Sequence, residues 1–155
     1  MRFKVASAFV LVLILVQAIQ LNAQIVDSSI SATDVEALKR LAKNLYSASQ
    51  SRDENALLGM LAPSVRYSSY GMRSDPVPLT SAKDKMIAVE SLYPNTIGFC
   101  TVGDTLAELE KATDGEVLLK TMNTDAENTH DAQCASISVT RVGVKWLISD
   151  IYIPF

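Results

Sequence analysis

Two kinds of hydrophobic periodicity follow one another along this chain. Over residues 33–50, apolar residues recur three or four positions apart and basic or amide side chains take the opposite side, which predicts an amphipathic helix. Its start, Thr33–Glu36, fits a capping box. Shorter helices are predicted over residues 53–61 and 81–93, each closed by a following proline. The first half of the domain is therefore predicted to be helical around one short strand.

That short strand is predicted at residues 65–69, and the proline-containing segment 71–79 is predicted to be a loop. From Ile97 onward the apolar period shifts towards two. Four strands are predicted there, at residues 98–109, 116–122, 133–142 and 145–153. Short turns at 113–115 and 142–143 favour antiparallel hairpins, because parallel strands need longer connections.

Two features of these strands predict the shape of the sheet. The apolar phase of the first strand slips near Gly103–Asp104, which is typical of a bulge in a bent strand. The last strand is apolar on both faces, with Trp146, Ile148 and Tyr152 on one and Leu147, Ile151 and Ile153 on the other. We therefore expect a curved sheet whose last strand is central and covered on both sides.

The N-terminal 23 residues have the pattern of a secretory signal peptide. Two basic residues lie within the first four positions, an apolar run covers residues 5–16, and Leu21–Ala23 offers a cleavage point. The mature protein would begin near Gln24, with cleavage after Ala18 as an alternative. A membrane anchor is the other interpretation, but the apolar run is shorter than the roughly 20 residues that span a bilayer. We expect a secreted, extracellular protein that has no membrane segment after cleavage.

Residues 24–155 have the length of one domain. Without Arg2 and Lys4, this part of the chain holds 12 basic and 17 acidic side chains, a formal charge of −5. An acidic balance argues against nucleic acid or an anionic membrane as a partner, since both attract basic surfaces.

Cys100 and Cys134 are the two cysteines of the chain, and in a secreted protein such a pair favours a disulfide over two buried thiols. The single histidine, His130, lies in a polar segment where a solvated side chain is more common than a general base. One histidine and two distant cysteines do not make a zinc site, so we expect no metal. Glycine-rich phosphate and dinucleotide motifs are lacking, and we expect no cofactor.

The element order resembles the nuclear transport factor 2-like (NTF2-like) superfamily, in particular its small secreted members from nematodes. The resemblance covers nearly the whole mature chain and depends on the stretch from Asp53 to Pro63 and on the strand around Lys145 and Trp146. It implies an α+β fold in which a cone-like curved antiparallel sheet wraps around N-terminal helices and leaves a pocket at its open end. It also implies frequent homodimers through the sheet. The superfamily includes isomerases, cyclases, dehydratases and non-catalytic binding domains.

The isomerase branch can be compared residue by residue. An ungapped placement puts Leu45 at the position of that branch's oxyanion-binding tyrosine and Ser69 at the position of its aspartate base. Leucine donates no hydrogen bond and serine has no suitable pKa for a base. Tyr46 would serve only after a register shift, so its expected role is an aromatic flank of the helix.

We therefore expect a non-catalytic protein that binds a small apolar ligand in the cone or acts as a dimeric interaction module. The expected ligand-binding residues are Tyr67, Asp104, Trp146 and Tyr152. The alternative is an isomerase or cyclase-like enzyme that uses a pocket carboxylate such as Asp104, whose pKa burial would raise. Asp150 is expected to be either a second pocket group or a paired charge near the end of the sheet.

Overall fold

A computed structural model describes residues 30–69, 72–93, 103–111, 115–122 and 133–152 of the protein, with the side chains of 133–136 left undescribed. Within these ranges the chain forms three helices and one seven-stranded sheet. The elements are α2 (Ala32–Ser51), α3 (Glu54–Met60), β1 (Leu61–Ser69), β2 (Met72–Arg73), β3 (Val77–Pro78), α4 (Ala82–Glu90), β4 (Thr105–Lys111), β5 (Val117–Met122), β6 (Gln133–Val142) and β7 (Lys145–Tyr152).

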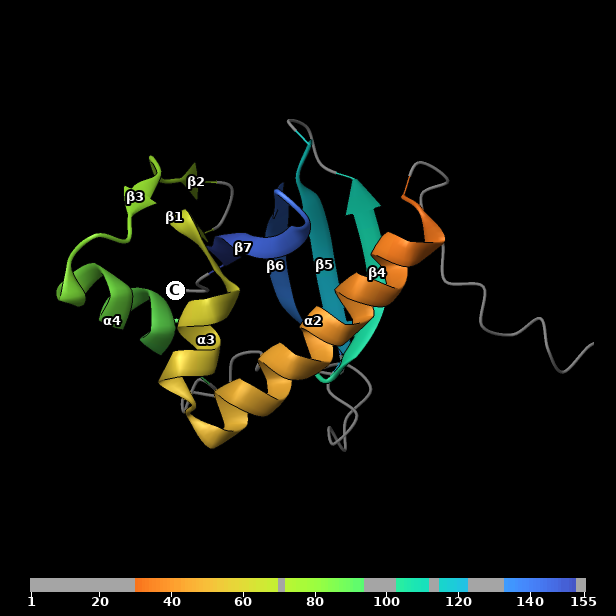
Figure 1. Ribbon diagram of the computed structural model, residues 1–155, viewed down its shortest axis with the longest axis horizontal. Helices are drawn as coiled ribbons and strands as arrows, with labels where there is room; N and C mark the ends of the chain where they lie inside the picture. The colour runs from red at the N-terminus through yellow and green to blue at the C-terminus, as the bar shows by residue number, and fades with distance from the viewer. Residues whose placement is uncertain (1–29, 70–71, 94–102, 112–114, 123–132, 153–155) are drawn as a thin grey trace, which may run out of the picture.

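The helices form one layer and the sheet the other. Helix α2 packs on β4, β5 and β7, whereas α3 and α4 lie beside β1 (Figure 1). The apolar side of α2 contributes Leu38, Ala42 and Leu45 to the core, and none of these side chains is exposed. They pack with buried residues of all the long strands. The α+β class and the curved sheet expected from the sequence are confirmed.

The start of α2 corrects one prediction. The helix cap is Ser31, whose hydroxyl accepts a hydrogen bond from the Asp34 amide at 3.1 Å. The same hydroxyl donates to the Asp34 carboxylate at 2.7 Å. Serine followed three residues later by an acid offers the same reciprocal cap as Thr33 with Glu36, but two residues earlier. The earlier cap adds Asp34 to the first turn, where it faces the sheet.

The sheet has the strand order β2-β1-β7-β6-β5-β4, and β3 also pairs with β1. Pairs from β4 to β7 are antiparallel, as predicted, but β1 runs parallel to β7. The sheet is therefore mixed. The predicted loop at 71–79 supplies the two-residue strands β2 and β3, which pair with β1. Short turns predict pairing only between strands that are consecutive in the chain, so the sequence pattern did not predict that β1 pairs with β7.

Register shifts occur in four pairings of the long strands, and two of them affect which residues enter the core. In β4 the irregularity lies between Leu106 and Glu108, a few residues after the predicted slip, and both Leu106 and Leu109 are buried. In β7 the shift opposite Ser138 and Val139 leaves Ser149 as the extra residue. Ile148 and Ile151 consequently enter the same core, although regular alternation would put them on opposite faces. Among the described residues no helix is long and apolar enough to span a membrane.

Candidate functional site

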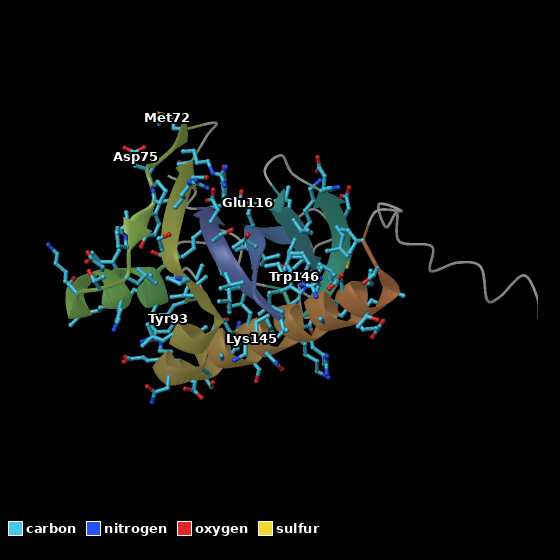
Figure 2. The ribbon with its side chains drawn as sticks, turned by 45° about the horizontal axis from the view of Figure 1, so that its top comes forward. Met72, Asp75, Tyr93, Glu116, Lys145 and Trp146 are labelled. Carbon is cyan, nitrogen blue, oxygen red and sulfur yellow. The ribbon has the colours of Figure 1, made fainter. Side chains whose placement is uncertain are left out.

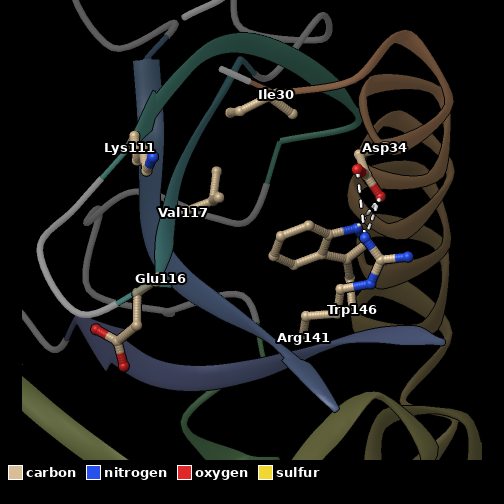
Figure 3. A pocket seen from close by; sticks show the side chains of 8 residues that line it. Ile30, Asp34, Lys111, Glu116, Val117, Arg141 and Trp146 are labelled. Atoms are coloured by element: carbon tan, nitrogen blue, oxygen red, sulfur yellow. Dashed lines mark hydrogen bonds and ion pairs between the residues drawn. The ribbon is translucent and has the colours of Figure 1, made fainter. Parts of the chain in front are cut away.

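A pocket of about 270 Å³ opens beside the first turn of α2. Its walls come from the residue before α2, the adjoining ends of β4 and β5, and the β6–β7 hairpin (Figure 3). The lining residues are Ile30, Asp34, Lys111, Gly115, Glu116, Val117, Arg141 and Trp146. The pocket therefore combines an aromatic and aliphatic wall with four charged side chains.

Trp146 forms one wall of the pocket and is held at its polar edge. Its indole Nε1–H donates a hydrogen bond of 2.9 Å to Oδ1 of Asp34. The ring is half-buried against the core, and the edge of its six-membered ring points towards Val117 (Figure 3). A buried indole usually finds such a partner for its N–H, and here the bond fixes how the ring is oriented.

Asp34 receives hydrogen bonds from three side chains. Besides Trp146 and Ser31, the Arg141 guanidinium lies 3.3 Å from Oδ1. The hydrogen bond from Ser31 is the main cause that lowers the pKa of Asp34 below its ordinary value, and the indole and Arg141 add to it. Arg141 is the direct cross-strand partner of Trp146 and its guanidinium lies 5.9 Å from the ring centroid, within the range of a cation–π contact.

Glu116 belongs to the pocket wall, but its carboxylate points away from the Trp146 ring (Figure 3). It is 6% exposed. Arg66 and Ser149 each donate to Oε1 at 3.2 Å, and Arg73 donates to Oε2. In Figure 2 Glu116 lies near the middle of the molecule and Met72 at the tip of β2, whose other residue, Arg73, reaches back to Glu116. The negative charge of Glu116 is therefore compensated outside the pocket.

Asp150 joins the same outer ionic network, which consists of Arg66, Ser68, Arg73, Glu116, Ser149 and Asp150. Its carboxylate lies 2.7 Å from the Ser68 hydroxyl and 2.5 Å from Nε of Arg73. Arg73 thus bridges two buried carboxylates. Of the two roles expected for Asp150, the paired charge is the one observed, since it lines neither of the described pockets.

The four expected ligand-binding residues do not share a pocket. Trp146 lines the pocket described above, whereas Asp104 lines a broad polar groove of about 660 Å³ along the last turns of α2. Tyr152, at the end of β7, is 40% exposed, and Tyr67 packs against the core on β1. Trp146 and Asp104 thus line two different described pockets, and ligand binding by the four residues stays a prediction.

The remaining groove residues are Lys43, Tyr46, Ser47, Gln50 and Ser51. Tyr46 is half-buried, in agreement with its expected role as an aromatic flank. His130, Cys100 and the side chain of Cys134 lie outside the described residues, so the disulfide stays a prediction. Among the described side chains no group of three or more metal-ligating residues comes together.

Two hydroxyls on the core side of β1 are buried and have no hydrogen-bond partner among the described residues. They belong to Tyr67 and Ser69. Burial raises the pKa of the Tyr67 phenol, and the negative charge of Asp84 raises it further. Ser68, between them, points to the other face and binds Asp150. The period of two along the strand explains why adjacent serines have such different surroundings.

Sequence reasoning missed Asp34, Lys111, Glu116 and Arg141 as pocket residues. The sequence pattern identified Asp34 only as a residue at the start of a predicted helix, and Glu116 only as the first residue of a predicted strand. Arg141 lies two residues before Gly143 and Trp146 three residues after it, so a two-residue hairpin turn at 143–144 would have predicted their pairing. No local signal connects either residue to α2.

No known family model matches the chain, and no curated protein matches it in sequence. Among solved structures it is similar to a DUF4783 family protein from Bacteroides ovatus, with a TM-score of 0.45 and 14% identity over 72% of this chain and 91% of that one. An NTF2-like protein of unknown function from Shewanella oneidensis gives a TM-score of 0.45 and 12% identity, over 78% and 98% of the two chains. An NTF2-like protein of unknown function from Pseudomonas putida gives a TM-score of 0.43 and 17% identity, over 80% of this chain and 87% of that one.

Identities this low carry no information about ligand, partner or activity, and the resemblance to secreted nematode proteins stays a prediction. The solved structures that this chain resembles include proteins described as NTF2-like. The chain itself has a helical layer over an open, curved, mixed sheet.

Proposed function

We propose that this protein is a secreted, non-catalytic binding protein that takes up a small, largely apolar molecule in the Trp146 pocket. The observation that supports it is the Trp146 ring, which lines the pocket while its N–H is already bound to Asp34. Ile30 and Val117 complete the apolar wall. An aromatic face with its polar edge satisfied favours a flat apolar partner, because stacking does not compete with another hydrogen bond.

The size of the pocket limits the ligand. At about 270 Å³ it lies just below the range of pockets that hold drug-sized molecules. A ligand of one or two rings fits this space. For so few atoms, dissociation constants between about 1 μM and 1 mM are expected, since affinity per atom has a ceiling. Titrations should cover that range.

Trp146 is the single tryptophan of the chain, so its fluorescence reports on this pocket alone. We would titrate the mature protein, residues 24–155, with the neutral two-ring probe 1-naphthylamine and follow both probe and tryptophan emission. Saturable quenching of Trp146 is expected. Ile30→Asn should weaken binding at least fivefold, because it places an amide in the apolar wall.

Ile87→Asn is the matched control. Ile87 is 39% exposed on α4 and does not line the pocket, so the same substitution there should leave binding unchanged. Thermal unfolding of both variants would verify that they fold. Absence of saturable quenching, or equal losses in the two variants, would exclude the pocket as the binding site.

Secretion has its own test. Expression of the full chain in a eukaryotic secretory host should release a protein whose N-terminal residue is Gln24, as determined by mass spectrometry. Native mass spectrometry of that material would also report on the proposed disulfide and on a homodimer through the sheet. A protein retained in the cell with its first residues intact would exclude the signal peptide.

The alternative function, an isomerase or cyclase-like enzyme, would use Asp104. In its favour, Asp104 and Tyr46 line the same groove, which brings a carboxylate and a phenol to one surface. However, acid–base chemistry of this kind benefits from a site that excludes water, and the groove is broad and open to solvent. Asp104→Asn should abolish turnover of any substrate that is found, without unfolding the protein.

A further inference from the structure

Hydrogen-bonding capacity is unequally distributed around the Trp146 pocket. Its two acceptor side chains, Asp34 and Glu116, are both engaged with donors of the protein. Its two cationic side chains, Lys111 and Arg141, are not fully engaged. A hydrogen-bond donor on a ligand would therefore find no free acceptor among these side chains. A hydrogen-bond acceptor on a ligand would find free N–H groups on Lys111 and Arg141.

Lys111 is the clearest unmatched donor. It is exposed at the end of β4, directly opposite Val117, and forms no ion pair with any described residue. In Figure 3 its side chain stands across the pocket from Trp146. An ammonium group has three N–H donors and no acceptor, so it can bind only a group with lone pairs.

Arg141 adds unused donors on the Trp146 side. Only its Nη1 contacts Asp34, at 3.3 and 3.5 Å, and the side chain is 53% exposed. A guanidinium carries five N–H donors, so several stay available at the rim of the pocket. Asp34 stays ionised near neutral pH because its pKa is lowered, and it holds Arg141 beside the ring.

The Trp146 pocket presents two cationic side chains, although the protein as a whole carries a net negative charge. The chain has a formal charge of −3, and its mature part is more acidic still. A negatively charged molecule is therefore repelled by the protein as a whole and is favoured only where cations are local. Glu116 does not cancel them inside the pocket, because its carboxylate points towards Arg66 and Arg73.

Resting on the proposed function, we infer that the ligand is a small organic anion: a flat apolar ring system that stacks on Trp146 and bears a carboxylate or a similar acidic group between Lys111 and Arg141. The ring supplies the apolar contact and the acidic group supplies the acceptors that the pocket lacks. A charge-assisted hydrogen bond from lysine or arginine is stronger than a neutral one, which gives the anion its preference over an uncharged analogue.

The test compares 2-naphthoate with 2-naphthamide, which have the same ring system and differ in charge. The ¹⁵N-labelled mature protein has one indole N–H resonance, that of Trp146, and its shift gives both dissociation constants. We expect naphthoate to bind about five- to tenfold more tightly at low salt. The preference should shrink as salt is raised to 0.5 M, because the pocket is open to solvent.

Lys111→Gln should reduce the preference to about twofold, and Lys111→Arg should restore it. Lys85→Gln, on the exposed side of α4, removes the same charge away from the pocket and should change neither constant. Equal affinities of the wild-type protein for the two compounds, or a preference unaffected by Lys111→Gln, would overturn this inference while leaving apolar binding intact. If neither compound shifts the indole resonance, both the inference and the proposed pocket fail.

Discussion

The indole Nε1 of Trp146 donates a 2.9 Å hydrogen bond to Oδ1 of Asp34, and this bond connects the β6–β7 hairpin to the first turn of α2. The two residues are 112 positions apart in the chain. Asp34 also completes the cap of α2 through Ser31. The Asp34 carboxylate thus both caps the start of α2 and fixes the orientation of the Trp146 ring.

This relationship predicts how the pocket responds to acid. The pKa of Asp34 is lowered in the folded protein, so the folded state binds this proton less readily than the unfolded state. Its contribution to stability is therefore complete above the ordinary value of 3.8 and is lost as pH falls through the lower folded pKa. The indole resonance of Trp146 should stay constant from pH 7 to about pH 4 and move below that. A shift centred above pH 4 would contradict the assignment.

Arg73 is expected to stabilise the edge of the sheet. It donates to both Glu116 and Asp150, which are 8% and 6% exposed as side chains. Arg73→Gln would leave two buried carboxylates without their shared cation. Because Arg73 itself is 40% exposed and other donors remain, we expect a loss of about 2 kcal/mol, between the values for exposed and buried pairs.

Urea unfolding would measure the loss. Lys39→Gln is the matched control, since it breaks the exposed pair between Lys39 and Glu36, which should cost less than about 0.5 kcal/mol. Similar losses in the two variants would show that the outer ionic network does not stabilise the fold.

Two glycines should respond in opposite ways to alanine. A Cβ at Gly103 would overlap the backbone of Met122, which cannot move aside as a side chain can, while the Gly103 amide is bound to Thr121 at 2.9 Å. We expect Gly103→Ala to destabilise the protein by about 2 kcal/mol. Gly59, inside α3, has open space around its Cβ position, so Gly59→Ala should stabilise by about 0.5–1 kcal/mol. Calorimetric melting of both variants would detect the opposite signs.

Adjacent serines on β1 give a third comparison. The hydroxyl of Ser69 is buried without a partner among the described residues, so Ser69→Ala should leave stability unchanged or raise it by about 1 kcal/mol. The Ser68 hydroxyl donates to Asp150 at 2.7 Å, and Ser68→Ala should cost about 1–2 kcal/mol. Equal effects of the two substitutions, measured by urea unfolding, would contradict the assigned faces of β1.

Local periodicity in the sequence was enough to predict most elements. The helices α2 and α3 and the strands β5, β6 and β7 begin and end within about two residues of the predicted positions, whereas α4 ends three residues before the predicted end. Their apolar spacing is a property of neighbouring residues, and proline or glycine marks several of their ends. The cap of α2 was displaced to Ser31 because two overlapping segments satisfy the same capping pattern.

The candidate site was much less predictable. Of the four expected ligand-binding residues, Trp146 lines one described pocket and Asp104 lines another, and their binding of a ligand stays a prediction. Which residues meet depends on the parallel pairing of β1 with β7 and on two bulges that reverse the alternation of side chains. Neither leaves a clear mark on the local pattern.

The sequence by itself therefore determined the α+β class, the order of the elements and the apolar faces that form the core, because each depends on residues close together in the chain. Only the tertiary structure decided that Asp34 holds Trp146 beside Arg141 and that Arg73 joins Glu116 to Asp150. These contacts connect residues between 43 and 112 positions apart. They form only after the sheet has curved and the helix has packed across it, since a polar pair gains its partner from packing and not from its neighbours in sequence.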